Sequence, residues 1–136
     1  DDNAEFAIPA AKLGLGYNAR WVRPLLAAVA PAKAKEMLFT GRRFKVAEAE
    51  AMGLVNAVVP AAELEARTLA LAGEIAANAP LTVRAAKRTI DELVRNPQTP
   101  DLATLDAAVA ACFASEDYAE GRLAFKEKRR PRFQGR

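Results

Sequence analysis

Histidine is absent from this sequence and cysteine occurs once, which excludes much of the chemistry open to a small protein. Without histidine the chain can form no Ser-His-Asp triad, no Cys-His pair and no imidazole metal site. A single thiol, Cys112, allows neither an internal disulfide nor a thiolate zinc site. We therefore expect no metal, and a reducing, cytoplasmic setting is the simplest interpretation of the cysteine usage.

Long apolar runs and phosphate-binding glycine motifs are also missing. No stretch approaches the roughly 20 apolar residues that a membrane-spanning helix needs, so we expect no membrane partner. Gly14 and Gly16 form a Gly-x-Gly pattern without the Gly-Lys-Ser/Thr ending of a P-loop or the third glycine of a dinucleotide-binding loop. An ordinary turn is the favoured interpretation of these two glycines.

The residues that are present have the balance of an ordinary globular domain. Of 136 residues, 51% are hydrophobic and 27% are charged, which is enough apolar material for one buried core. The sequence does not begin with methionine, and we expect it to be part of a longer protein.

Positive charge is concentrated at the C-terminal end. Between Arg122 and Arg136 there are seven basic residues and one acidic residue, whereas the whole chain has a net charge of only +3. A solvated basic tail is the first interpretation, a contact with a phosphate-bearing small molecule the second, and nucleic acid the third. No nucleic-acid-binding motif or row of aromatic platforms accompanies the charge, so we expect no nucleic-acid partner.

The spacing of apolar residues predicts a mainly helical chain. In the first half, helices are expected over 19–29, 31–39 and 46–52, with Asn18 as an N-cap and Gly41 and Gly53 as stops. In the second half, one helix carries a buried stripe of Leu64, Thr68, Leu71 and Ile75, and the next begins at Pro80 with Val83, Ala86, Ile90 and Leu93 facing inward. Asp101 and Ser115 are the expected N-caps of the last two helices.

Two short segments favour an extended conformation. Residues 42–45 and 54–59 contain the aromatic and β-branched residues typical of strands, and the second segment ends at Pro60. We expect them to form a small two-stranded ribbon in which Phe44 pairs with Val58.

Four blocks of the sequence resemble the enoyl-CoA hydratase/isomerase (crotonase) family. In chain order they are FAIPAAKLGLGY, LFTGRRFKVAEAEAMGLVNAVVP, ANAPLTVRAAKRTI and SEDYAEGRLAFKEKRRPRFQGR. They follow the family's order and spacing across all 136 residues, and it is their combination that is specific.

The resemblance implies a mainly α structure that corresponds to the C-terminal helical trimerisation region of a crotonase-like α/β fold. In that family a spiral of ββα units precedes the region, so residues 1–17 would be the remnant of the end of the spiral core. Residues 18–136 would form the C-terminal helical domain. The implied assembly is a homotrimer or a dimer of trimers.

The same resemblance implies an enzyme that acts on acyl-CoA thioesters through an oxyanion hole. The oxyanion hole and the first of two hydratase glutamates would lie in the family's N-terminal half. The second glutamate follows the proline that Pro9 matches, and here that position is Ala10. Alanine can neither accept nor donate a proton, so we assign no catalytic residue to this chain and expect the chain alone to be inactive. Glu5 lies on the wrong side of the proline to replace it.

Five residues are implied to bind substrate. Phe125 and Lys128 match a phenylalanine that covers the adenine of CoA and a lysine that reaches one of its phosphates, and at a spacing of i and i+3 we expect them to share one face of a helix. Leu15, Gly16 and Tyr17 match positions near the acyl group. The competing interpretations are core packing for Phe125 and a solvated surface position for Lys128. No separate cofactor is expected, because CoA enters as part of the thioester substrate.

Two other functions stay open. The chain could be a helical module for oligomerisation and CoA contact without activity of its own. It could also be an unrelated helical protein whose basic tail binds anions.

Overall fold

The computed structural model describes residues 1–136 as seven α-helices, two short 3₁₀ helices and one two-stranded antiparallel sheet. The mainly helical structure expected from the sequence is thereby confirmed. The chain divides into two compact units, residues 1–67 and 68–136, with the boundary inside helix α4. Whether residues 1–17 are the end of a spiral core stays a prediction.

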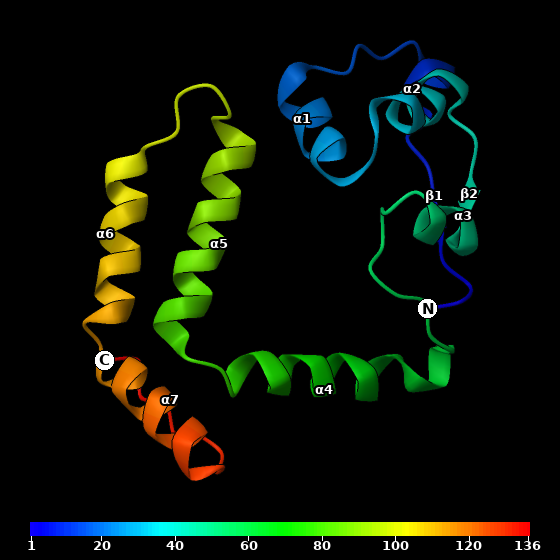
Figure 1. Ribbon diagram of the computed structural model, residues 1–136. Helices are drawn as coiled ribbons and strands as arrows, with labels where there is room; N and C mark the ends of the chain where they lie inside the picture. The colour runs from blue at the N-terminus through cyan, green and yellow to red at the C-terminus, as the bar shows by residue number, and fades with distance from the viewer. The chain divides into compact units, whose positions relative to one another are not determined.

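The first unit contains short elements (Figure 1). In chain order they are β1 (Glu5–Phe6), η1 (Pro9–Leu13), α1 (Ala19–Ala28), α2 (Pro31–Thr40), β2 (Phe44–Lys45), α3 (Val46–Ala51), η2 (Ala61–Glu63) and the start of α4 (Leu64–Ala76).

Two residues of this unit set helix ends as predicted. The side chain of Asn18 accepts a hydrogen bond from the backbone N–H of Trp21 at 3.2 Å and begins α1. Gly41 ends α2 in the left-handed conformation with φ 53°, and its N–H donates to the carbonyl of Met37. A Cβ at Gly41 would lie 3.3 Å from the Cα of Pro9, so the position also needs the absence of a side chain.

The predicted strand pairing is wrong. β2 pairs antiparallel with β1, so that Phe44 lies opposite Phe6 rather than Val58. Residues 54–59 form no strand, although the carbonyl of Val59 accepts a hydrogen bond from the N–H of Asp2. Strand propensity reports that a segment suits an extended conformation but says nothing about its partner, and here the partner is about 40 residues away in sequence.

The core of the first unit lies between α1, α2 and β2. Its buried members are Leu25, Val29, Ala34, Met37 and Phe44, and the ring of Phe44 is completely inaccessible to solvent. The core therefore packs strand β2 against the α1–α2 helix pair.

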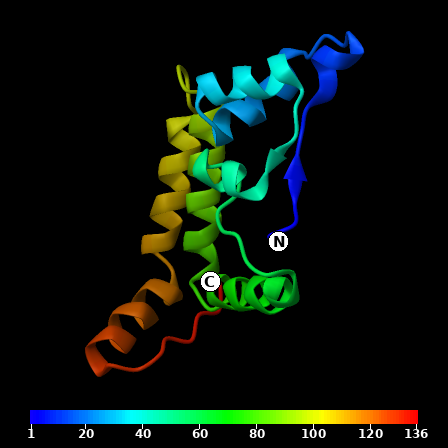
Figure 2. The same ribbon diagram turned by 90° about the vertical axis from the view of Figure 1, so that its right-hand side faces the viewer.

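The second unit contains the rest of α4 and, after it, α5 (Pro80–Arg95), α6 (Leu102–Phe113) and α7 (Glu116–Glu127). α5 and α6 run antiparallel and lie side by side in both views (Figures 1 and 2). The loop between them is held by Glu92, whose carboxylate accepts hydrogen bonds from the side chain of Asn96 and the N–H of Asp101, both at 3.0 Å. These bonds lower the pKa of Glu92, the Asn96 contact most.

The predicted N-caps of α6 and α7 are confirmed. Asp101 accepts from the N–H of Thr104 at 3.1 Å, and the Ser115 hydroxyl accepts from the N–H of Tyr118 at 3.1 Å. Each cap satisfies one of the backbone donors that a helix N-terminus leaves free.

The predicted buried stripes of α4 and α5 are wrong for this chain. Leu71 and Ile75 on α4 and Ile90 on α5 are all about half exposed or more, and Ala85 is the buried residue of α5 instead of Ala86. The helical periodicity is real, but α5 packs within the chain mainly on α6, which leaves the rest of its apolar face uncovered. Despite this apolar surface, no helix has both the length and the hydropathy needed to cross a membrane.

Candidate functional site

The segment from Pro9 to Tyr17 surrounds the position at which the family's second glutamate is expected. Pro9 begins η1, and Gly14 ends it with φ 65°. The carbonyl of Ala10 accepts the N–H groups of Gly14 and Leu15, and the residue is 6% exposed. The side chain at position 10 is therefore a buried methyl group with no polar atom to take part in proton transfer.

The three predicted acyl-group residues follow this turn and are exposed. A Cβ added at Gly16 would meet no atom within 4 Å, and Leu15 is 60% exposed. The ring of Tyr17 meets that of Trp21 edge to face, with centroids 5.3 Å apart. The structure thus brings Tyr17 together with Trp21, which is itself exposed.

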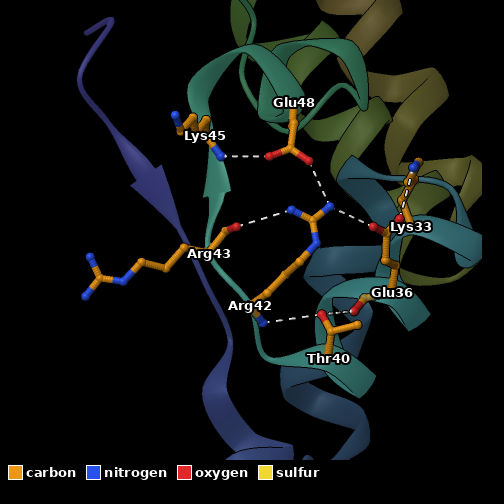
Figure 3. Close-up of polar contacts among 7 residues, drawn as sticks. All are labelled: Lys33, Glu36, Thr40, Arg42, Arg43, Lys45 and Glu48. Carbon is orange, nitrogen blue, oxygen red and sulfur yellow. Dashed lines mark hydrogen bonds and ion pairs between the residues drawn. The ribbon is translucent and has the colours of Figure 1, made fainter.

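A polar cluster fixes the turn that follows α2 (Figure 3). Nη2 of Arg42 lies 2.7 Å from a carboxylate oxygen of Glu36 and 2.8 Å from one of Glu48. The Arg42 guanidinium also lies 3.7 Å from the ring centroid of Phe44, and Nη1 donates to the carbonyl of Arg43. The side chain of Arg43 points away from the cluster and pairs across the sheet with Glu5 at 2.9 Å.

The cluster is structural rather than catalytic. Hydrogen bonding to Arg42 is the main cause that lowers the pKa of Glu36 and of Glu48, and these two carboxylates in turn raise the pKa of Arg42. Glu48 additionally accepts the N–H of Lys45 at 3.0 Å at the start of α3. Both acids are held ionised, so neither is suited to exchange a proton near neutral pH. In the sequence, Thr40-Gly41-Arg42 marks the turn at which the cluster forms. Residue spacing did not identify the two glutamates that bind Arg42 there.

Phe125 is the most exposed large hydrophobic residue, at 89%. Its interpretation as a core residue is therefore wrong for this chain. It lies at the edge of an apolar cavity of about 810 Å³ between α5, α6 and α7, whose wall includes Ala85, Ile90, Val109, Phe113 and Phe133. An exposed ring beside an apolar hollow can contact a flat aromatic group.

Lys128 does not continue the helix, contrary to the prediction that it shares a helical face with Phe125. α7 ends at Glu127, and Lys128 adopts the left-handed conformation with φ 54°. The N–H of Arg129 donates to the carbonyl of Ala124 at 3.0 Å and that of Lys128 to the carbonyl of Phe125 at 3.3 Å. This is a Schellman motif with lysine at the position that usually holds glycine, at a cost of about 1–2 kcal/mol.

The basic tail is folded back along α7 rather than freely solvated. Arg129 makes two parallel hydrogen bonds to Glu120, at 2.6 and 2.9 Å, and a third bond to Glu127 at 2.6 Å. The N–H of Arg132 also donates to Glu120, at 2.8 Å. These contacts, the Arg129 bonds first, lower the pKa of Glu120 to about 2.

A buried carboxylate holds the last residues of the tail. Asp117 is 3% exposed and accepts the N–H groups of Gln134 at 2.6 Å and Gly135 at 2.8 Å. Phe133 packs over Gly121. The tail therefore has a defined path, which sequence reasoning missed because the contacts join residues up to 20 apart.

Comparison with known proteins gives the family. The enoyl-CoA hydratase/isomerase family model matches residues 1–136. A carnitinyl-CoA dehydratase from Escherichia coli O157:H7 is 38% identical over 139 residues, an alignment that covers 99% of this chain and 53% of the relative. A carnitinyl-CoA dehydratase from Proteus mirabilis is 39% identical with the same coverage.

Solved structures agree with this result. An enoyl-CoA hydratase/isomerase family protein from Hyphomonas neptunium matches with a TM-score of 0.88 and 40% identity over 98% of this chain and 50% of its own. An enoyl-CoA hydratase from Mycobacterium tuberculosis matches with a TM-score of 0.87 and 34% identity, over 99% of this chain and 54% of its own. The chain thus spans about half the length of the relatives it matches. From its motifs, its fold and these similarities, the chain belongs to the enoyl-CoA hydratase/isomerase family.

Proposed function

We propose that this chain serves as the C-terminal region of an enzyme that acts on acyl-CoA thioesters. The observation that carries the proposal is the match of the family model along the whole chain. Relatives named carnitinyl-CoA dehydratase and enoyl-CoA hydratase support a lyase or isomerase reaction at the acyl group. Because the chain spans about half their length, the parent enzyme would draw its oxyanion hole from residues outside this chain.

In this proposal the chain binds substrate and supplies no proton-transfer group. Ala10 occupies the position of a hydratase glutamate, and its buried methyl group cannot exchange a proton with water or substrate. An oxyanion hole stabilises a thioester enolate whichever acid or base accompanies it, so the loss of one glutamate is compatible with an acyl-CoA enzyme. The chain alone would be inactive.

The proposed CoA contacts are Phe125 for the adenine and Lys128 for a phosphate. The exposed ring of Phe125 and the unpaired ammonium of Lys128 support these roles, because neither side chain has a partner within the chain that would compete with a ligand. Leu15, Gly16 and Tyr17 are proposed to line the acyl group, supported by their exposure in the turn after Ala10.

Assembly into a homotrimer or a dimer of trimers is part of the proposal. The uncovered apolar faces of α4 and α5 and the cavity beside Phe125 support it, because surfaces of this kind mark contact sites between proteins. The same faces favour the second candidate function, a helical module for oligomerisation and CoA contact without activity. A cytoplasmic setting is proposed from the single cysteine.

The test is to measure CoA binding and hydration of a 2-enoyl-CoA by the full-length protein, before and after Ala10→Glu. We expect the unmodified protein to bind CoA, and the restored carboxylate to raise the hydration rate about a hundredfold, the usual contribution of a general acid–base group. Ala11→Glu, one residue further along η1, is the matched control and should give no such gain. Absence of CoA binding would contradict the proposed enzyme, and binding without turnover in either form would favour the module.

A further inference from the structure

Lys128 is the only residue other than glycine with a positive φ in the chain. The other helix ends that use the left-handed conformation, after η1, α2 and α3, place Gly14, Gly41 and Gly53 there. Glycine would relieve the backbone strain at position 128 as well. A residue with a Cβ persists in a strained backbone conformation where the surrounding structure holds it, and such residues are common at functional sites.

The lysine side chain has no such use within the chain. Its ammonium makes no hydrogen bond or ion pair, and the residue is exposed. The left-handed turn is instead bounded by the side chain of Arg129, which is bonded to both Glu120 and Glu127. One cation of this dipeptide is therefore fully paired while its neighbour is left free.

The pairing of Arg129 holds the backbone on the far side of the turn. Its bidentate contact with Glu120 ties residue 129 to the helix two turns earlier, and the N–H of Arg132 donates to the same carboxylate. A planar guanidinium that binds a carboxylate through two parallel bonds fixes direction as well as distance. Residue 128 is thus held between the end of α7 and an anchored arginine.

We propose that Arg129 and Glu120 are positioning residues that hold Lys128 in its left-handed turn so that its ammonium stays available to a phosphate-bearing ligand. The inference rests on the proposed function, in which that ligand is the CoA portion of the substrate. A compact ammonium on a flexible stem suits a phosphate as a point charge, whereas the fork of Arg129 suits the carboxylate that it already binds. The two neighbouring cations thus have separate tasks.

The direction in which one substitution changes the affinity for CoA distinguishes positioning from simple charge attraction. Glu120→Gln removes a negative charge close to the turn, so a purely electrostatic effect would tighten CoA binding. Positioning requires the opposite, because a neutral amide holds Arg129 less firmly. We expect the dissociation constant of CoA, measured by calorimetry on the full-length protein, to rise about threefold in this variant.

A double-mutant cycle then tests whether Arg129 acts through Lys128. We expect Lys128→Gln to weaken CoA binding about tenfold and Arg129→Gln about fourfold, as for the loss of a charge-assisted contact and of its support. The double variant should bind about as weakly as Lys128→Gln alone, because Arg129 has nothing left to position. Arg130→Gln, which removes an equal charge from the next residue, is the matched control and should change affinity less than twofold.

Each outcome decides the matter. Tighter binding in Glu120→Gln, or additive losses in the double variant, would overturn the positioning role while leaving CoA binding intact. Failure of the unmodified protein to bind CoA would remove the proposed function together with this inference. Thermal melting is followed for every variant, and if Arg129→Gln does not fold, Arg129→Lys, which keeps the charge but loses the fork, takes its place in the cycle.

Discussion

The ends of α2 and α7 are alike in two respects but differ in the residue that adopts the left-handed conformation. In each, a residue with φ near 54° ends the helix, and the arginine that follows is bonded to two glutamates. At the end of α2 the left-handed residue is Gly41, which is buried against Pro9. At the end of α7 it is Lys128, which is exposed.

The difference shows which position is set by packing. Gly41 has no alternative, because any Cβ would press on the backbone of Pro9. Lys128 adopts the same left-handed conformation without that crowding. Folding therefore does not require a lysine at this position. This difference is the reason why we propose a ligand contact for Lys128 and a packing role for Gly41.

Exchanging the two residues gives the largest expected effect. Gly41→Lys should destabilise the protein by about 3 kcal/mol, because it adds left-handed strain to a close contact with the Pro9 backbone. Urea denaturation measures the change. Gly73→Lys, the same exchange at an exposed position in α4 where an added Cβ would meet no atom within 4 Å, is a control for the residue types. A loss below 1 kcal/mol would mean that packing does not distinguish the two helix ends.

The reverse exchange is expected to have a smaller effect of opposite sign. Lys128→Gly should stabilise the protein by about 1 kcal/mol, since glycine adopts the left-handed conformation without a Cβ penalty. A rise in the urea midpoint with an unchanged slope is the expected result. If the variant is less stable than the original, the lysine side chain contributes to folding, and its proposed availability to a ligand loses its main support.

The smallest expected effect is a dependence on acid at the end of α7. Glu120 has a pKa of about 2 in the folded protein, below its ordinary value of 4.5. A lowered pKa adds stability that is complete above 4.5 and is lost as the pH falls from 4.5 towards 2. Because solvent still reaches both side chains of the Arg129–Glu120 pair, the contribution is modest. In the Glu120→Gln variant, the melting temperature should therefore fall slightly less than in the unmodified protein as the pH drops from 4.5 towards 2. Near pH 7 the melting temperatures of both proteins should depend on pH in the same way.

Local features of the fold were predictable because the interactions behind them span few residues. Asn18, Asp101 and Ser115 each cap a helix through a bond to the residue three positions later, and side-chain chemistry is enough to identify them. The strand partner of Phe44 was missed because its identity depends on a segment 38 residues earlier. Ala10 was singled out from the sequence, and its burial could be learned only from the structure.

The candidate site was predicted in part for the same reason. Phe125 and Lys128 were identified by motif, but the motif implied a continuous helical face, whereas the helix ends between them. The residues around Arg129 in the sequence gave no indication that its side chain would bind Glu120, nine residues earlier. That pairing goes together with the left-handed turn at Lys128, which ends the helix and lets the chain turn back.

By itself the sequence determined the helices, most of their ends and the family to which the chain belongs, because propensity, capping and motif order are properties of residues close in the chain. Tertiary structure alone decided which strand Phe44 joins, which apolar faces stay uncovered and which cation of the Lys128–Arg129 pair is left free. Those outcomes depend on contacts that exist only after distant backbone segments have been brought together, and no local rule encodes them.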